Sequence, residues 1–183
     1  MRKIVLTFGF AAGAVLAAMM LLTLPFLERI SFEKGAIIGY TSMVLTFLMV
    51  FFGVRSYREN VGGGRVTFGR ALVVGLLITA IASACYVLAW EVISHQFMPD
   101  FADKYAARAI EKAKASGATD AEVAEQTRKM SEFKEMYKNP VIKAALTLIE
   151  PLPVGIVFAL VAAGTLSRKR PRAGGSAPAM KGA

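Results

Sequence analysis

The sequence predicts an all-α fold, namely a polytopic four-helix transmembrane bundle with an extramembrane helical hairpin between the third and fourth spans. Two observations predict it. Hydrophobic residues make up 55% of the 183-residue chain, and they are gathered in four long apolar blocks. The connection between the last two blocks is instead rich in Ala, Lys and Glu, which are good helix formers in water. We expect residues 1–170 to form a single membrane domain and residues 171–183 a disordered tail.

The four apolar blocks are the predicted spans, and they cover about residues 4–26, 35–54, 71–90 and 144–166. Each has about 20 residues or slightly more, which at about 1.5 Å per residue matches a hydrocarbon core of about 30 Å. The first three blocks contain no Asp, Glu, Lys or Arg. Because backbone amides in lipid must be satisfied within the chain, each block is expected to be a helix.

The positions of the basic residues predict the orientation of the bundle. They gather at the N-terminus, in the second connection and in the tail, whereas Glu28 and Glu33 balance the basic residues of the first connection. The basic residues in question are Arg2, Lys3, Arg55, Arg58, Arg65, Arg70, Arg168, Lys169, Arg170 and Arg172. Since basic loops stay on the cytoplasmic side, we expect both termini and the second connection to be cytoplasmic. The net charge of +9 therefore mostly reflects the orientation of the protein in the membrane. No group of aromatic and basic residues indicates nucleic-acid binding.

The predicted extramembrane hairpin covers about residues 100–139, where acidic and basic residues are equally numerous. Its first helix is expected to end before Gly117, and its second to open with a capping box of Thr119 and Glu122 and to stop at Asn139. Charged residues three or four apart predict ion pairs along each helix. These pairs are Asp100/Lys104, Glu125/Lys129 and Glu135/Lys138. The two helices are expected to pack through Phe101, Tyr105, Val123, Met130 and Phe133.

Three stretches together resemble one bacterial membrane family, catalogued as domain of unknown function 4199. They are SYRENVGGGRVTFGRALVVG, PDFADKYAARAIEKAKASGA and the LPVG that precedes the basic end. The resemblance covers residues 1 to about 170. It implies a four-helix inner-membrane protein and no particular reaction, cofactor or ligand.

Glu150 is an acidic residue inside the fourth apolar block, directly before Pro151 and close to Pro153. Counted back from Arg168, a span of about 20 residues begins near Leu148, so that Glu150 lies in the opening turn near the outer boundary. Proline is tolerated in a first helical turn, which fits this interpretation. The alternative is a helix that begins near residue 141, in which case Glu150 lies deeper and the prolines produce a kink.

Glu91 and the only histidine, His95, are four residues apart just beyond the third span. With Glu150 they form the one candidate cluster for a metal or proton site, because carboxylates and imidazole bind divalent cations. The second histidine of a zinc-binding helix is missing, and a solvated helix end is the preferred explanation of the spacing. We therefore assign no metal, no cofactor and no catalytic residue.

Small residues recur four apart in every span, a spacing that lets helix backbones approach closely in lipid. The sets are Gly9/Gly13, Gly35/Gly39, Gly75/Thr79/Ser83 and Gly155/Ala159/Ala163. They predict packing within the bundle or a homo-oligomer. Beyond the lipid bilayer, the expected partner is therefore another protein or a second copy of the chain.

The sequence contains no signature of an enzyme, and two functions are left open. The first is a structural, accessory or regulatory membrane component whose hairpin contacts a partner. The second is a small transporter or channel subunit that uses Glu150 and the outer Glu91/His95 cluster, because transporters carry ionisable groups and broken helices inside the membrane. The depth of Glu150 separates the two.

Overall fold

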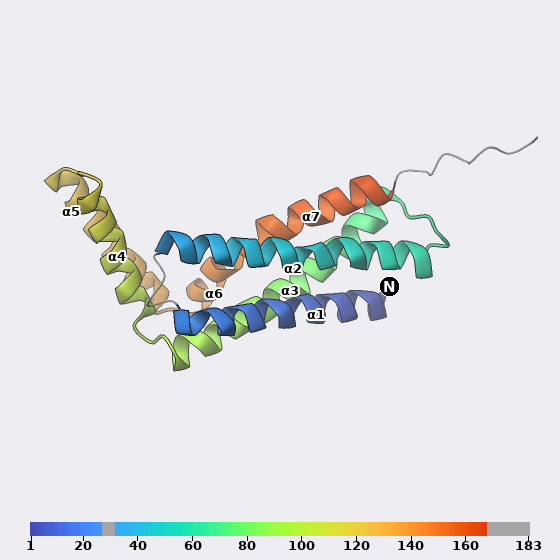
Figure 1. Ribbon diagram of the computed structural model, residues 1–183, viewed down its shortest axis with the longest axis horizontal. Helices are drawn as coiled ribbons and strands as arrows, with labels where there is room; N and C mark the ends of the chain where they lie inside the picture. Colours follow the sequence, from blue (N-terminus) through green and yellow to red (C-terminus); the bar gives the residue numbers. More distant parts are fainter. Residues whose placement is uncertain (27–31, 168–183) are drawn as a thin grey trace, which may run out of the picture.

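The chain is described here by a computed structural model, which covers residues 1–26 and 32–167. Within these residues every regular element is a helix (Figure 1). The elements are α1 (Arg2–Thr23), the short 3₁₀ turn η1 (Leu24–Phe26), α2 (Phe32–Asn60), α3 (Phe68–Gln96), α4 (Phe101–Ala115), α5 (Asp120–Tyr137), α6 (Pro140–Ile149) and α7 (Pro151–Leu166). The predicted all-α class is confirmed for this part of the chain. The predicted tail, 171–183, lies outside the described residues.

Four helical segments are long and apolar enough to cross a membrane, as the apolar blocks predict. They are Arg2–Phe26, Lys34–Asn60, Phe68–Gln96 and Pro140–Leu166. In Figure 1 the start of α1, the connection between α2 and α3 and the last turn of α7 lie at one end of the bundle, and α4 and α5 extend from the other. Many large apolar side chains on the outside of the bundle are exposed, which is the pattern of helices surrounded by lipid.

The helix α3 lies at the centre of the bundle and packs against α1 on one side and α7 on the other. Small residues produce both contacts. A Cβ built on Gly9 lies 2.8 Å from Ile81 Cβ, and one built on Gly75 lies 2.8 Å from Ala159 Cβ. Backbones can approach this closely only because the side chains are so small.

The small-residue pattern produces close contacts within the bundle on three helices and not on α2. Gly35 and Gly39 of α2 have no neighbour within 4 Å of an added Cβ, so this pair forms no close helix contact in the described chain. Small residues four apart show that another helix backbone could approach that face closely. They do not show that a helix of the same chain lies there. The three other sets, on α1, α3 and α7, have neighbours within contact distance.

The helices α4 and α5 lie side by side and antiparallel, joined by a turn at Gly117 (Figure 1). Gly117 has a φ of 80°, in the left-handed region that favours glycine. The predicted capping box is confirmed, since Thr119 accepts from the Glu122 amide and Glu122 accepts from the Thr119 amide. Such a cap stabilises a helix by about 1 kcal/mol. The three predicted ion pairs are also present.

The fourth apolar segment consists of two helices that meet at Glu150. Asn139 caps α6 by accepting from the amides of residues 141 and 142, and Pro140 occupies its first turn. Pro151 then begins α7, because a proline has no amide to continue the hydrogen-bond ladder of α6. Both readings of this segment are partly right: the helix starts near residue 141, and Glu150 lies at a break before the last helix.

Candidate functional site

A group of polar and aromatic side chains lies where α3, α5, α6 and α7 meet, at the end of the bundle that carries α4 and α5. The residues come from α3 (Tyr86, Trp90, Glu91 and Ser94), from the end of α5 (Tyr137), from α6 (Lys143) and from the break before α7 (Glu150). We call this group the outer junction. Among the described residues, it contains the only ion pair between the third and the fourth candidate spans.

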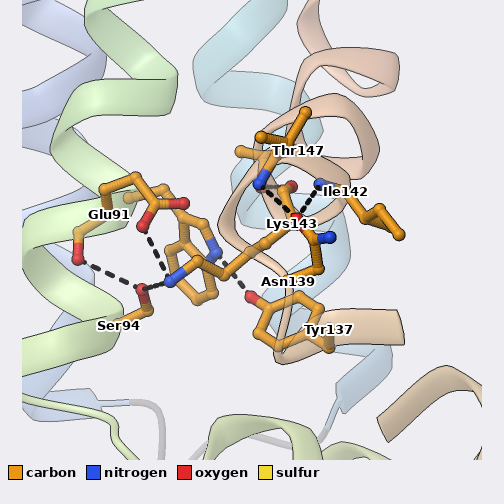
Figure 2. Close-up of polar contacts among 9 residues, drawn as sticks. Glu91, Ser94, Tyr137, Asn139, Ile142, Lys143 and Thr147 are labelled. Carbon is orange, nitrogen blue, oxygen red and sulfur yellow. Dashed lines mark hydrogen bonds and ion pairs between the residues drawn. The ribbon is translucent and has the colours of Figure 1, made fainter. Parts of the chain in front are cut away.

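Lys143 and Glu91 form an ion pair at the centre of the outer junction (Figure 2). Lys143 Nζ lies 2.7 Å from Glu91 Oε2 and donates a hydrogen bond of 3.2 Å to Ser94 Oγ. The Lys143 side chain is 16% exposed and that of Glu91 31% exposed, so water screens the pair only in part. The other Glu91 oxygen, Oε1, is buried and has no hydrogen-bond partner among the described residues. The pair therefore depends strongly on both of its members.

Tyr137 forms the second connection across the outer junction. Its hydroxyl accepts a hydrogen bond of 2.7 Å from Trp90 Nε1. The pKa of Tyr137 is raised to about 12, mainly by burial; the bond from Trp90 opposes the shift, and the charges of Glu91 and Glu150 contribute to it. The hydroxyl thus stays neutral at physiological pH. Because its unfolded pKa is 10.0, its contribution to stability is present below pH 10 and is lost as the pH rises toward 12.

Aromatic rings continue from Trp90 into the α4–α5 pair. The centroids of Trp90 and Phe101 are 4.7 Å apart in an edge-to-face arrangement, and those of Tyr105 and Phe133 are 5.2 Å apart. Tyr137 contacts both Phe101 and Phe133. Phe101, Tyr105 and Phe133 were predicted to pack the two helices together, and they do. The rings also attach α4 and α5 to α3, which the sequence did not indicate.

Glu150 is held by a hydrogen bond of 2.7 Å that Tyr86 Oη donates to its Oε2. Tyr86 is buried, whereas Glu150 is exposed at the surface of the helix bundle. The carboxylate therefore lies level with Tyr86, about one helical turn before Trp90 along α3. The bond joins the break between α6 and α7 to the central helix.

The predicted cluster of Glu91, His95 and Glu150 is not brought together. Glu91 binds Lys143, Glu150 binds Tyr86, and His95 lies exposed near the end of α3. Within residues 1–26 and 32–167, no three His, Cys, Asp or Glu side chains are placed to share a metal ion. Glu91 and His95 do lie four residues apart on one helix, as predicted. The Glu91 carboxylate, however, forms an ion pair with Lys143 of α6.

Lys143 was not identified from the sequence as a candidate site residue. Besides Glu150 it is the only charged residue between positions 140 and 166, and this isolation was the available signal. An intramembrane or near-membrane charge requires a partner. Asn139 and Pro140, a strong helix start, show in addition that the helix begins early enough to include Lys143.

Comparison with known proteins gives a family but no activity. No curated protein and no solved structure matches the chain. A family model described as "Protein of unknown function (DUF4199)" matches residues 7–168, which include most of the first candidate span, the whole of the other three and the outer junction. The chain therefore belongs to this family, as the three motif stretches indicated.

Proposed function

We propose that this chain is a multi-pass inner-membrane protein with a structural, accessory or regulatory role, and that it acts through contact with another protein and not as an enzyme. In this proposal both termini are cytoplasmic and α4 and α5 form a helical hairpin outside the membrane. The basic residues of the second connection and the tail support the orientation. The polar surfaces of α4 and α5, where exposed ion pairs such as Arg128–Glu132 lie, support a position in water.

The accessory role is supported mainly by the contacts that attach the α4–α5 pair to the central helix α3. The ring contact of Trp90 with Phe101 and the bond from Trp90 to Tyr137 connect α4 and α5 to the central helix. The Lys143–Glu91 pair holds α6, which follows α5, against the same helix. A short loop alone would leave the pair free to reorient. A rigidly mounted helical pair with a charged outer face presents a preorganised surface to a partner, which lowers the entropic cost of binding.

The orientation predicts the result of fusing reporter enzymes to the chain. Because Gly63 lies in the basic second connection and Gly117 at the tip of the hairpin, fusions at these two positions should report opposite compartments. An alkaline phosphatase fusion should be active at Gly117 and inactive at Gly63, with a fluorescent protein giving the reverse. The same compartment for both positions would exclude the four-span topology.

The accessory role predicts which positions of the chain touch other proteins. A photoreactive amino acid at Ala107 or Ala124, both small and exposed on α4 and α5, should give a discrete protein adduct in intact membranes. The matched control is Val157, which is 57% exposed on α7 and should give lipid adducts. Adducts only to lipid at all three positions would remove the support for a protein partner.

One observation favours the second candidate, a small transporter or channel subunit. The fourth candidate span is broken at an acidic residue, and broken helices form the ion and substrate sites of many transporters. If Ala71 to Trp90 spans the hydrocarbon core, Tyr86 and Glu150 lie about 6 Å inside its outer boundary. A proton or cation flux through reconstituted protein that falls in Glu150→Gln would put this candidate first.

A further inference from the structure

A small cavity lies between α1, α2 and α3 in the half of the bundle nearer the outer junction. Its volume is about 50 Å³. Three of its lining residues are methionines, namely Met19, Met20 and Met43, and its polar lining comes from Thr23, Ser42 and Tyr86. Nothing in the proposed function uses this cavity.

The volume limits what the cavity can hold. A cavity needs at least about 10–15 Å³ of this kind of volume to hold one water molecule, so about 50 Å³ is enough for a small ligand such as a single ion. Three thioethers form an unusual lining for so small a space. Met19 and Met20 lie three and four residues after Leu16, which also lines the cavity, and Met43 lines it from α2, where it is 5% exposed.

Thioether sulfur is a soft ligand that selects soft cations, Cu(I) above all. The hydroxyls of Ser42 and Thr23 are each engaged by a backbone carbonyl, with donor–acceptor distances of 2.8 Å. Their protons are therefore committed, and only their oxygen lone pairs are left for a ligand. An electron-rich lining of this kind suits a cation and disfavours an anion.

The charge of a bound cation has a counterpart nearby. Tyr86 lines the cavity and donates its hydroxyl proton to Glu150, so one carboxylate lies one hydrogen bond away from a lining residue. A monovalent cation in the cavity would thus be balanced by one carboxylate through one hydrogen bond. A divalent hard cation would find neither enough charge nor the oxygen ligands that it requires.

We propose that Met19, Met20 and Met43 bind a single soft monovalent cation, of the class of Cu(I), in the cavity between α1, α2 and α3. The thioethers supply the ligands and Glu150, through Tyr86, the balancing charge. Such a site gives the chain a ligand irrespective of whether its role is accessory or in transport.

The test uses Ag(I), a soft monovalent ion that undergoes no redox change under the assay conditions. Because the thiol of Cys85 also binds soft metals, the full-length chain carries Cys85→Ser in every variant. In detergent micelles this protein should bind about one Ag(I), as measured by competition with a chromogenic chelator. Replacing Met19, Met20 and Met43 together by leucine should weaken binding by about tenfold or more, since leucine keeps the volume and removes the sulfur.

The matched control replaces Met49, Met98 and Met130, which do not line the cavity, by leucine and should bind Ag(I) like the parent. X-ray absorption of the bound silver should show sulfur neighbours that are lost in the cavity variant. Helix content and the unfolding midpoint verify that each variant is folded. A folded parent that binds no Ag(I), or a folded cavity variant that binds it as tightly as the parent, would overturn the proposal.

Discussion

Replacing Lys143 by methionine is expected to lower the free energy of unfolding by about 2–3 kcal/mol. The change leaves Glu91 with one oxygen that is already buried without a partner and a second that loses its counter-ion. Loss of one member of a fully buried pair costs about 3–5 kcal/mol, and the 31% exposure of Glu91 reduces this figure. Unfolding in mixed micelles, driven by a denaturing detergent and followed by circular dichroism, measures the difference.

Two variants show whether the cost comes from the uncompensated charge. The double variant Glu91→Gln with Lys143→Met removes both charges and should recover more than half of the loss, because a neutral amide needs no counter-ion. The matched control is Lys134→Met, which removes the pair with Asp103, whose side chain is 66% exposed. It should cost less than about 1 kcal/mol. Equal losses in Lys143→Met and Lys134→Met would show that the outer junction does not depend on its ion pair.

The features that the sequence predicted best are those decided by neighbours along the chain. The capping box of Thr119 and Glu122 and the pair of Asp100 with Lys104 join residues three or four apart, so a single helix turn is enough to form them. Gly117 is similarly local, because its turn needs a positive φ. The four spans follow as directly, since length and hydropathy alone meet the requirement of the bilayer.

The outer junction could be predicted only in part, because its contacts join distant segments. Glu91 and Lys143 are separated along the chain by the whole of α4 and α5. The residues adjacent to either one therefore do not indicate that the two form a pair. The carboxylate was noted, but it was grouped with His95, which shares its helix face, and the residue that binds it comes from another helix. Tyr86 and Glu150 likewise meet only once α3 and the α6–α7 break are packed together.

At the contact of α3 with α7, adding a single methyl group at Gly155 is expected to lower stability more than the same change at the other glycines of the bundle. A Cβ on Gly155 would overlap Thr79 Cγ2 and lie 2.9 Å from Phe47 Cε1, and both neighbours are almost fully buried. Gly155→Ala should therefore lower the free energy of unfolding by about 1–3 kcal/mol, the usual cost of overpacking a core. It should do so although alanine is the better helix former by about 0.5–1 kcal/mol.

The control for this prediction comes from the helix whose glycines have no neighbours. Gly35→Ala and Gly39→Ala in α2 add the same methyl group to open space, so they should leave stability unchanged or raise it by the helix propensity of alanine, about 0.5–1 kcal/mol. The detergent unfolding assay used for Lys143 measures all three variants. A loss at Gly39 as large as that at Gly155 would mean that α2 packs closely against a further helix, and the most direct source of one is a second copy of this chain. A neutral Gly155→Ala would instead mean that α3 and α7 do not approach each other as closely as Gly155 and Thr79 indicate, and the central contact of the bundle would have to be drawn again.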